Sequence, residues 1–502
     1  MYRILSSLLF LWLLSITAFG QNEKKISLAE ALKTAVERNL DIQLQRVNIE
    51  SQSLGFDLTK ARFEPVVNAT LSTSERENEP RNILEGDSAF TSTSDTLSAQ
   101  LLKNFDFGFS YSVDFTANTA NSGAQSELAG DTYFTQLTFG FEQQLLRGFS
   151  LSKEIYKKDQ LVASRDISIA EQDLEIQISS IIQQTENAYW DLVYAIEQLK
   201  VTKQSLDLAK TLYDQNKIKI EVGTLAPIEL VNTEATVANR ERDIIDAENR
   251  VRAAEDALKK VMNLPFQEWP THLMPSDQLT VDASSIDETE SYELARRYRP
   301  ELQKTNLESQ KSLLEIKYNQ NQLKPELKLG GTYRTKGFDA NSVSVANQLR
   351  EAEWYRSIDE LYGIDFPEYS LQLSLAWNPL NKQAKINLAR ARATLKQTEL
   401  RHQQTEVNIM EEVRSALREI EANLKAIKAN EKSVRFQEEN LKAEEQKFQN
   451  GLSTNYRVSE VQDQLSQSRS TLIQSKVNYL KAMVSYHKAV GNLLSQKQIS
   501  IQ

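Results

Sequence analysis

The sequence of 502 residues contains no cysteine, only three histidines, and few glycines (15) and prolines (10). Without cysteine there is no disulfide scaffold, thiolate metal site or thiol nucleophile. The histidines are far apart in sequence, and no catalytic triad or phosphate-binding glycine loop is apparent. Acidic residues (69) outnumber basic ones (59), whereas a nucleic-acid-binding protein needs a basic surface. We therefore expect no enzymatic activity, no cofactor, no metal site and no nucleic-acid partner.

Residues 1–20 have the pattern of a secretory signal peptide. Arg3 supplies the charged start, 8–16 form an apolar run, and Ala18 and Gly20 fit the small-x-small cleavage rule. The absence of cysteine after this site excludes a lipoprotein anchor. No later stretch reaches the ~18 apolar residues that a membrane-spanning helix needs. We expect that any membrane-spanning part of the exported protein is made of β-strands.

Glycine and proline are absent from two long stretches, 149–222 and 380–450, which are rich in strong helix formers. Both carry heptads of apolar residues, which predict coiled-coil packing. In the first the heptad residues are Leu192, Leu199, Leu206, Tyr213 and Ile220, and in the second they are Ile420, Ile427, Val434, Leu441 and Phe448. At ~1.5 Å per residue, each helix would be roughly 100 Å long.

One offset, 228 residues, relates the two heptad series and takes Gly223 to Gly451. After each glycine, a second stretch without breakers (228–264 and 452–490) predicts a shorter helix that returns antiparallel. The chain therefore contains one architecture twice. The expected organisation is a signal peptide (1–20), a first repeat (21–264), a connector beside the helices (265–300), a second repeat (301–494) and a C-terminal tail (495–502).

Between the helical stretches, apolar residues alternate with polar ones, which predicts β-strands. The clearest case is 105–115, where every odd position is apolar. Similar strands are expected at 133–141 and 371–377 and weaker ones at 67–71 and 327–333. Polar loops are expected at 75–96, 116–131 and 337–366. Two or three strands per half cannot close a barrel, for which ~8 is the smallest number seen. Several copies must therefore share both a barrel and a helical tube.

The segments around the two matched glycines resemble the paired helix-turn motifs of the TolC-type outer-membrane efflux proteins (outer-membrane factors). They read Gly223-Thr-Leu-Ala-Pro-Ile-Glu229 and Gly451-Leu-Ser-Thr-Asn-Tyr-Arg457-Val-Ser-Glu460. The strand-to-helix segments Gln144-Leu-Leu-Arg-Gly148 and Trp377-Asn-Pro-Leu380 add to the resemblance. It covers about 26–494, in the family's order and in duplicate.

The resemblance implies a mainly α-helical protein with a membrane β-domain. Three copies would form a 12-stranded barrel in the outer membrane, continuous with a 12-helix tube across the periplasm. A periplasmic adaptor and an inner-membrane pump of the RND or ABC type would dock below it. The expected function is a passive export duct of a tripartite efflux or type I secretion system, for small molecules or polypeptides.

This sequence departs from the family pattern in two places. An additional hairpin near 97–115 leaves either four or six strands per chain, and six would give an 18-stranded barrel. Family members often have an acidic residue six positions after each tip glycine. Glu229 is the acidic residue six positions after Gly223. The matching position after Gly451 is Arg457, and an acidic residue, Glu460, follows three positions later.

The tips are the expected functional sites. In a trimer each tip charge forms a ring around the axis, so we place Glu229, Arg457 and Glu460 at the periplasmic aperture, with Arg457 pairing across subunits. The alternative is that they are ordinary solvated charges. The expected tip turns and adaptor-docking residues are Gly223, Thr224, Leu225, Gly451, Leu452 and Ser453.

A second class of function fits the heptads equally well. A trimeric coiled-coil scaffold in the periplasm or at the cell surface would need long helices but no transport activity. It would not account for the duplicated strand segments or the returning helices, so the export duct is the preferred interpretation.

Overall fold

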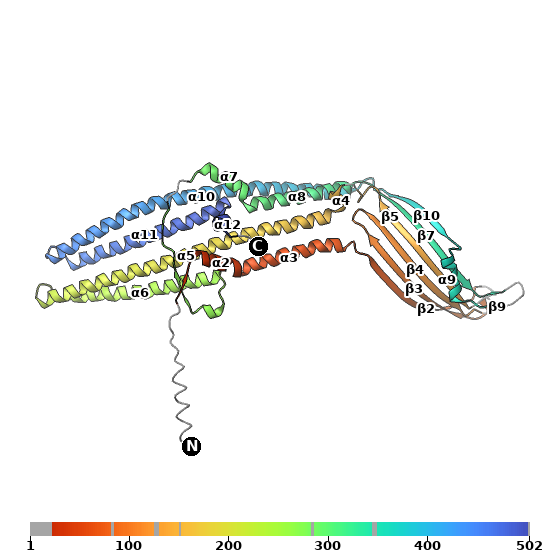
Figure 1. Cartoon of the computed structure of the whole chain (residues 1–502), viewed down its shortest axis with the longest axis horizontal. Helices are drawn as coiled ribbons and strands as arrows, with labels where there is room; N and C mark the ends of the chain where they lie inside the picture. Colours follow the sequence, from red (N-terminus) through yellow and green to blue (C-terminus); the bar gives the residue numbers. More distant parts are fainter. Residues whose placement is uncertain are drawn as a thin grey trace, which may run out of the picture. The chain divides into compact units, whose positions relative to one another are not determined.

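The computed structural model describes residues 23–81, 85–124, 130–149, 152–282, 286–343 and 349–499. The predicted signal peptide lies outside these residues. The chain divides into two compact units (Figure 1). The helical unit comes from 1–48, 170–304 and 402–502, and the sheet unit from 49–169 and 305–401.

Two helical hairpins dominate the helical unit (Figure 1). In the first, α5 (Lys158–Glu221) is followed by α6 (Ile228–Val261), and in the second, α10 (Lys382–Gln449) is followed by α11 (Asn455–Val490). The predicted long and returning helices are thus confirmed; α5 begins after a separate turn of helix, α4 (Lys153–Tyr156). In the described residues no helix combines the length and apolar character needed to cross a bilayer.

The predicted heptad residues line the interior of the second hairpin. Ile420, Ile427, Leu441 and Phe448 are buried, and they belong to two apolar clusters that α10 shares with α11. Burial of a Leu, Ile or Phe side chain contributes about 1.5–3 kcal/mol, so these clusters hold the hairpin together. In the first hairpin Leu192 is fully buried, and the later heptad residues are half-buried.

Two pairs of shorter helices are equal in length. The helices α2 (Leu28–Arg38) and α7 (Glu288–Tyr298) have 11 residues each, and α3 (Leu40–Ala61) and α8 (Pro300–Asn321) have 22 each. The Ser27 side chain caps α2 by accepting a hydrogen bond from the Glu30 amide (3.2 Å). The predicted second cap, Ser285, lies outside the described residues, and Asp287 caps α7 instead.

The connector contains short regular elements, η2 (Phe266–Glu268) and β6 (His272–Pro275). The strand β6 pairs in parallel with β1 (Glu23–Ile26), so the beginning of the described chain is joined to the middle. The buried Tyr189 of α5 donates its hydroxyl to Asp277 (2.5 Å), which fastens the connector to the long helix. In the C-terminal tail, α12 (Leu493–Gln496) follows α11.

The sheet unit contains one six-stranded antiparallel sheet in the order β10-β7-β5-β4-β3-β2. Its strands are β2 (Val66–Asn78), β3 (Phe90–Asn104), β4 (Phe109–Ser122), β5 (Asp131–Gln144), β7 (Glu326–Ala340) and β10 (Glu368–Ala376). The predicted additional hairpin is β3–β4, and it pairs along its full length with β2 and β5. Six strands, rather than four, therefore form the described sheet.

The predicted strand over 105–115 is wrong in its first four residues, which form the turn between β3 and β4. Gly108 has φ +83°, and the Phe105 amide donates to the Phe109 carbonyl (2.8 Å). Alternation of Phe105, Phe107 and Phe109 imitates a strand, yet these rings cluster at the turn, with centroids 5.5–6.0 Å apart.

The strands also extend further than predicted at the other end of the sheet. The predicted loops 75–96, 116–131 and 337–366 include the ends of β2, β4 and β7 and the start of β3. The start of β3 and the end of β4 are rich in Thr and Ser, which pair across strands once a neighbouring strand is present. We call this the distal end of the sheet, and the end that carries the 105–108 turn the proximal end. Two further short strands, β8 (Ser342–Val343) and β9 (Leu349–Arg350), and the helix α9 (Trp354–Gly363) lie between β7 and β10.

Candidate functional site

The six-stranded sheet has one apolar face, built from odd-numbered residues of every strand. Cross-strand pairs on this face include Leu71 with Leu97, Phe115 with Leu137, and Leu373 with Leu329. Many of these side chains are exposed, Leu71 and Leu373 among them. A wide, exposed apolar face marks contact with lipid or protein.

The opposite face, from even-numbered residues, is polar and charged. Gln100 donates to Asp114 (2.5 Å), Lys328 pairs with Glu142 (3.1 Å), and Glu368 pairs with Lys336 (2.8 Å). Strands that alternate apolar with polar residues in this way are typical of a membrane wall with lipid on one side and water on the other.

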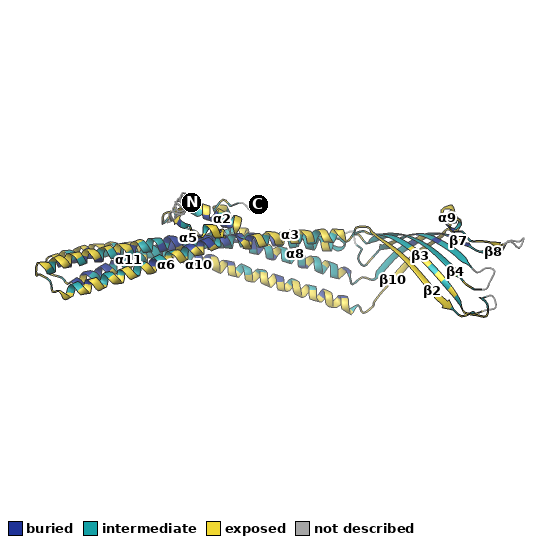
Figure 2. Ribbon diagram, turned by 90° about the horizontal axis from the view of Figure 1, so that it is seen from below, coloured by how far each residue is buried: buried dark blue, intermediate teal, exposed yellow. Residues whose placement is uncertain are grey.

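Both edges of the sheet are open in the single chain. The strand β10 is exposed along its whole length, and β2 along all but its last residue (Figure 2). Each presents a row of unpaired backbone groups, which is a template for pairing with another strand.

The hairpin tips are closed by the predicted glycines. Gly223 has φ +79° and Gly451 has φ +74°, the left-handed conformation that glycine adopts without strain. At the first tip the Thr224 backbone amide donates to the Lys219 backbone carbonyl (2.9 Å). At the second tip the Leu452 backbone amide donates to the Lys447 backbone carbonyl (2.8 Å). Both tips are therefore Schellman motifs.

Two contacts join the tips to each other within one chain. The Lys219 ammonium donates to the Phe448 carbonyl (2.8 Å) and lies 3.8 Å from the centroid of its ring. The amide of the buried Asn455 donates to the Glu229 carboxylate (3.4 Å). The structure thus brings one predicted aperture residue, Glu229, against the second tip.

The other two predicted aperture residues pair on their own helix. The Arg457 guanidinium lies 2.7 Å from the Glu460 carboxylate, one turn further along α11, and both side chains are partly exposed. Next to them, the Ser453 hydroxyl hydrogen-bonds Glu444. This bond, together with Lys447, holds the pKa of Glu444 below its usual range.

The tips also expose side chains, although Leu225 and Ser453 of the predicted docking residues are half-buried. Leu452 is 78% exposed, and Thr224 and Val222 are exposed as well. Tyr456, four residues after Leu452, is 79% exposed and was not among the residues predicted from the sequence. Lys219 and Asn455 were not predicted either, because contacts between hairpins depend on tertiary packing and leave no local pattern.

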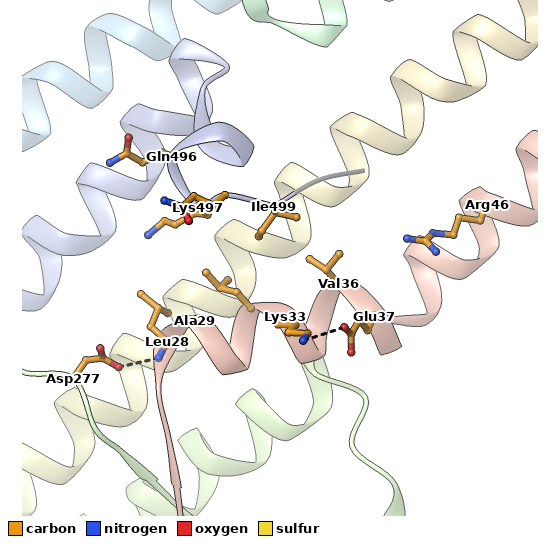
Figure 3. A pocket seen from close by; sticks show the side chains of 12 residues that line it. Leu28, Ala29, Lys33, Val36, Glu37, Arg46, Asp277, Gln496, Lys497 and Ile499 are labelled. Atoms are coloured by element: carbon orange, nitrogen blue, oxygen red, sulfur yellow. Dashed lines mark hydrogen bonds and ion pairs between the residues drawn. The ribbon is translucent and has the colours of Figure 1, made fainter. Parts of the chain in front are cut away.

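A pocket lies beside α2 rather than at a tip. It encloses about 840 Å³ and is lined by α2, Asp277 and the tail residues Gln496 to Ile499 (Figure 3). Of the interactions drawn there, the Leu28 amide donates to the Asp277 carboxylate and joins α2 to the connector, whereas Lys33 pairs with Glu37 within α2. We assign the pocket no functional role.

Comparison with known proteins agrees with this architecture. The family profile described as outer membrane efflux protein matches residues 31–264 and 291–492. No curated protein matches the chain in sequence. Among solved structures, the Campylobacter jejuni CmeC outer membrane channel is 14% identical with a TM-score of 0.66, covering 93% of this chain and 86% of that one.

Two further structures are similar over comparable lengths. The Vibrio cholerae outer membrane protein VceC is 12% identical, with a TM-score of 0.66 and coverage of 92% of this chain and 96% of that one. A membrane protein from Pseudomonas aeruginosa is 14% identical, with a TM-score of 0.67 and coverage of 92% and 93%. At these identities the structures show the fold, whereas the profile covers most of the chain. The protein belongs to the outer membrane efflux protein family.

Proposed function

We propose that this protein is the outer-membrane duct of a tripartite efflux or type I secretion system. The observation that carries the proposal is the six-stranded sheet, which has an apolar face, a polar face and two unpaired edges. Such a sheet suits a wall between lipid and water that is closed by further copies of the same chain. The duct is passive and catalyses no reaction.

The sheet edges are suited to pairing between copies. Because all five strand pairings are antiparallel, β2 and β10 run in opposite directions, and β10 of one copy can extend the sheet at β2 of the next. In a homotrimer the six strands per chain close an 18-stranded barrel, in place of the 12 strands that the resemblance implied. The four hairpin helices per chain (α5, α6, α10 and α11) form a 12-helix periplasmic tube.

Exposed apolar stripes on two helices support packing between copies. On α3, Leu40, Val47 and Leu54 recur every seven residues, and on α10 Leu400 and Val407 do the same; all five are more than half exposed. Heptad stripes of this kind bury their surface against another helix.

The lengths of the helices support a twofold internal repeat. An offset of 260 residues separates both ends of α2 from those of α7, and both ends of α3 from those of α8. The ends of α5 (Glu221) and α10 (Gln449) are 228 residues apart, as the sequence predicted.

The tips are the proposed contact with the periplasmic adaptor, through Gly223, Thr224, Leu225, Gly451, Leu452 and Ser453. Exposure of Leu452 and Tyr456 supports a docking surface there. An RND or ABC pump in the inner membrane would deliver the cargo through the adaptor. Glu229, Arg457 and Glu460 are the proposed charge rings at the aperture.

Channel recordings test the function directly. Purified protein inserted into planar bilayers, and into liposomes for swelling assays, should conduct ions and small solutes. A coiled-coil scaffold, the alternative function, would give no permeability in either assay.

Closure of the barrel by several copies of the chain can be tested with engineered cysteines, because the chain has no cysteine of its own. A variant with Thr70→Cys on β2 and a cysteine scanned along 370–374 of β10 should form covalent trimers on oxidation. The single-cysteine variants serve as matched controls and should stay monomeric in denaturing gels. If no position in the scan cross-links, the two edges do not meet and the closed barrel is excluded.

A further inference from the structure

The helix α9 packs on the apolar face of the sheet, near its distal end (Figure 1). The Thr135 hydroxyl donates to the Ser357 carbonyl (2.8 Å), and the Thr335 hydroxyl donates to the Leu361 carbonyl (3.2 Å). Both threonines are odd-numbered, so they share the face of Leu137 and Phe139. In a membrane wall, α9 is therefore on the lipid side rather than in the duct.

The contact is close and specific. A Cβ atom added at Gly337 would lie 1.6 Å from the Ser357 carbonyl oxygen, so only glycine lets α9 approach this far. Asp339, 4% exposed, accepts the Glu353 amide before the helix (2.8 Å) and pairs with Arg350 (2.5 Å). These interactions hold α9 in one place on β5 and β7.

The residues beneath α9 interrupt the apolar surface. Going distally along β7, Leu329 and Tyr333 are followed by Thr335, Gly337 and Asp339 on the same face. On β5, Phe139 and Leu137 are likewise followed by Thr135. Without α9, the lipid side of these two strands would become polar before the strands end.

The helix and the residues after it present aromatic side chains instead. Trp354 is 61% exposed, Tyr362 79% and Phe366 61%. At the proximal end of the same sheet, Phe105, Phe107 and Phe109 form a second aromatic group. Membrane β-barrels have aromatic girdles at both boundaries of the apolar band, where amphipathic rings lie at the level of the lipid headgroups.

We propose that α9, with residues 364–366, is an interfacial anchor that binds the boundary between headgroups and acyl chains in the outer leaflet. Its occupant is the lipid surface itself, since α9 continues the apolar face of a sheet in an outer-membrane protein. The charges of Arg350 and Arg356 are paired with Asp339 and Glu353, so apolar and aromatic contact, rather than phosphate binding, supplies the attachment. This inference depends on the proposed function, because it requires that the sheet lies in a bilayer.

Tryptophan quenching in liposomes tests the anchor. The full protein and Trp354→Phe are reconstituted with phosphatidylcholine brominated near the headgroup or deep in the acyl chains, and the difference between the two emission spectra isolates Trp354. We expect this difference to be quenched by the shallow bromines, less by the deep ones, and little by acrylamide in the water. Quenching by acrylamide alone would place Trp354 in water and overturn the proposal.

A second tryptophan distinguishes failure of the anchor proposal from failure of the proposed membrane function. Trp377 follows β10 at the proximal end and is 66% exposed. If brominated lipid quenches Trp377, measured with Trp377→Phe, but not Trp354, the sheet lies in the bilayer and only the anchor is refuted. If lipid quenches neither, the membrane wall itself is refuted.

Discussion

Gly451 ends the longest helix of the protein in a conformation that other residues adopt only at a cost. With φ +74° and nothing within 4 Å of an added Cβ, that cost comes from the backbone alone. We expect Gly451→Ala to destabilise the tip by about 1 kcal/mol. Hydrogen exchange of 446–456 should become faster, and Gly451→Asn, which tolerates the left-handed region, should have a smaller effect. Equal exchange in both variants would contradict a conformational role.

Arg457 carries the only basic charge among the proposed aperture residues. Its removal would free the Glu460 carboxylate and abolish the expected pairing of Arg457 across subunits at the aperture, so Arg457→Ala should increase single-channel conductance, most clearly at low ionic strength. The matched control is Arg469→Ala on the same helix, since Arg469 pairs with Glu438 away from the tip. Equal conductance in Arg457→Ala and the wild-type protein would mean that Arg457 is an ordinary solvated charge.

Glu186 predicts a pH dependence of stability. Burial raises the pKa of this carboxyl, and Lys497, 2.6 Å away, opposes the shift only in part. The folded protein therefore binds this proton more tightly than the unfolded chain, so stability falls as pH rises from the ordinary pKa of Glu through the raised value.

The measurement is the thermal unfolding temperature from acidic to neutral pH. In Glu186→Gln the unfolding temperature should decline less as pH rises, because the glutamine amide does not titrate. Glu197→Gln, a more exposed substitution on the same helix, controls for the change of side chain. An unchanged slope in Glu186→Gln would assign the decline to other groups.

At the scale of elements, the attachment of α9 can be broken by one methyl group. Gly337→Ala forces the Ser357 carbonyl away from the sheet, at a cost of about 1–3 kcal/mol. Proteases should then cut the 341–367 segment faster. Gly330→Ala on the same strand is the matched control, since its Cβ would lie 3.6 Å from the nearest atom. Equal cleavage rates would show that α9 is not held by this contact.

The elements also differ in how well local sequence predicts them. The long helices follow from their composition and heptads, because each helix hydrogen-bonds within itself. The 105–108 turn does not, because its alternating phenylalanines satisfy the strand pattern equally well. Whether residues 105–108 form a turn or a strand depends on where β3 stops pairing with β4, and local sequence does not show this.

At the scale of the whole molecule, the β3–β4 hairpin should set the width of the barrel. Odd-numbered residues of β2 and β5 lie on the same face of the sheet, so deletion of 82–122 lets the two strands pair without a change of face. A trimer with four strands per chain would have a cross-section and conductance roughly twofold smaller, because barrel diameter grows about linearly with strand number.

Deletion of 82–85 alone controls for loss of the loop, because it leaves both strands in place. Conductance that falls in the longer deletion but not in the shorter one would support the hairpin as part of the wall. Equal conductance in all three proteins would show that β3 and β4 do not contribute to the limiting cross-section.

The sequence by itself determined the features that depend on neighbouring residues. They are the two long helices, their returning partners, the glycine tips and the alternation of the strands. Only the tertiary structure decided which strands pair, that six share one sheet, that Lys219 contacts Phe448, and that α9 packs on β5 and β7. Periodicity records which face of an element is apolar, whereas the partner of that face is chosen by packing between residues far apart in the chain.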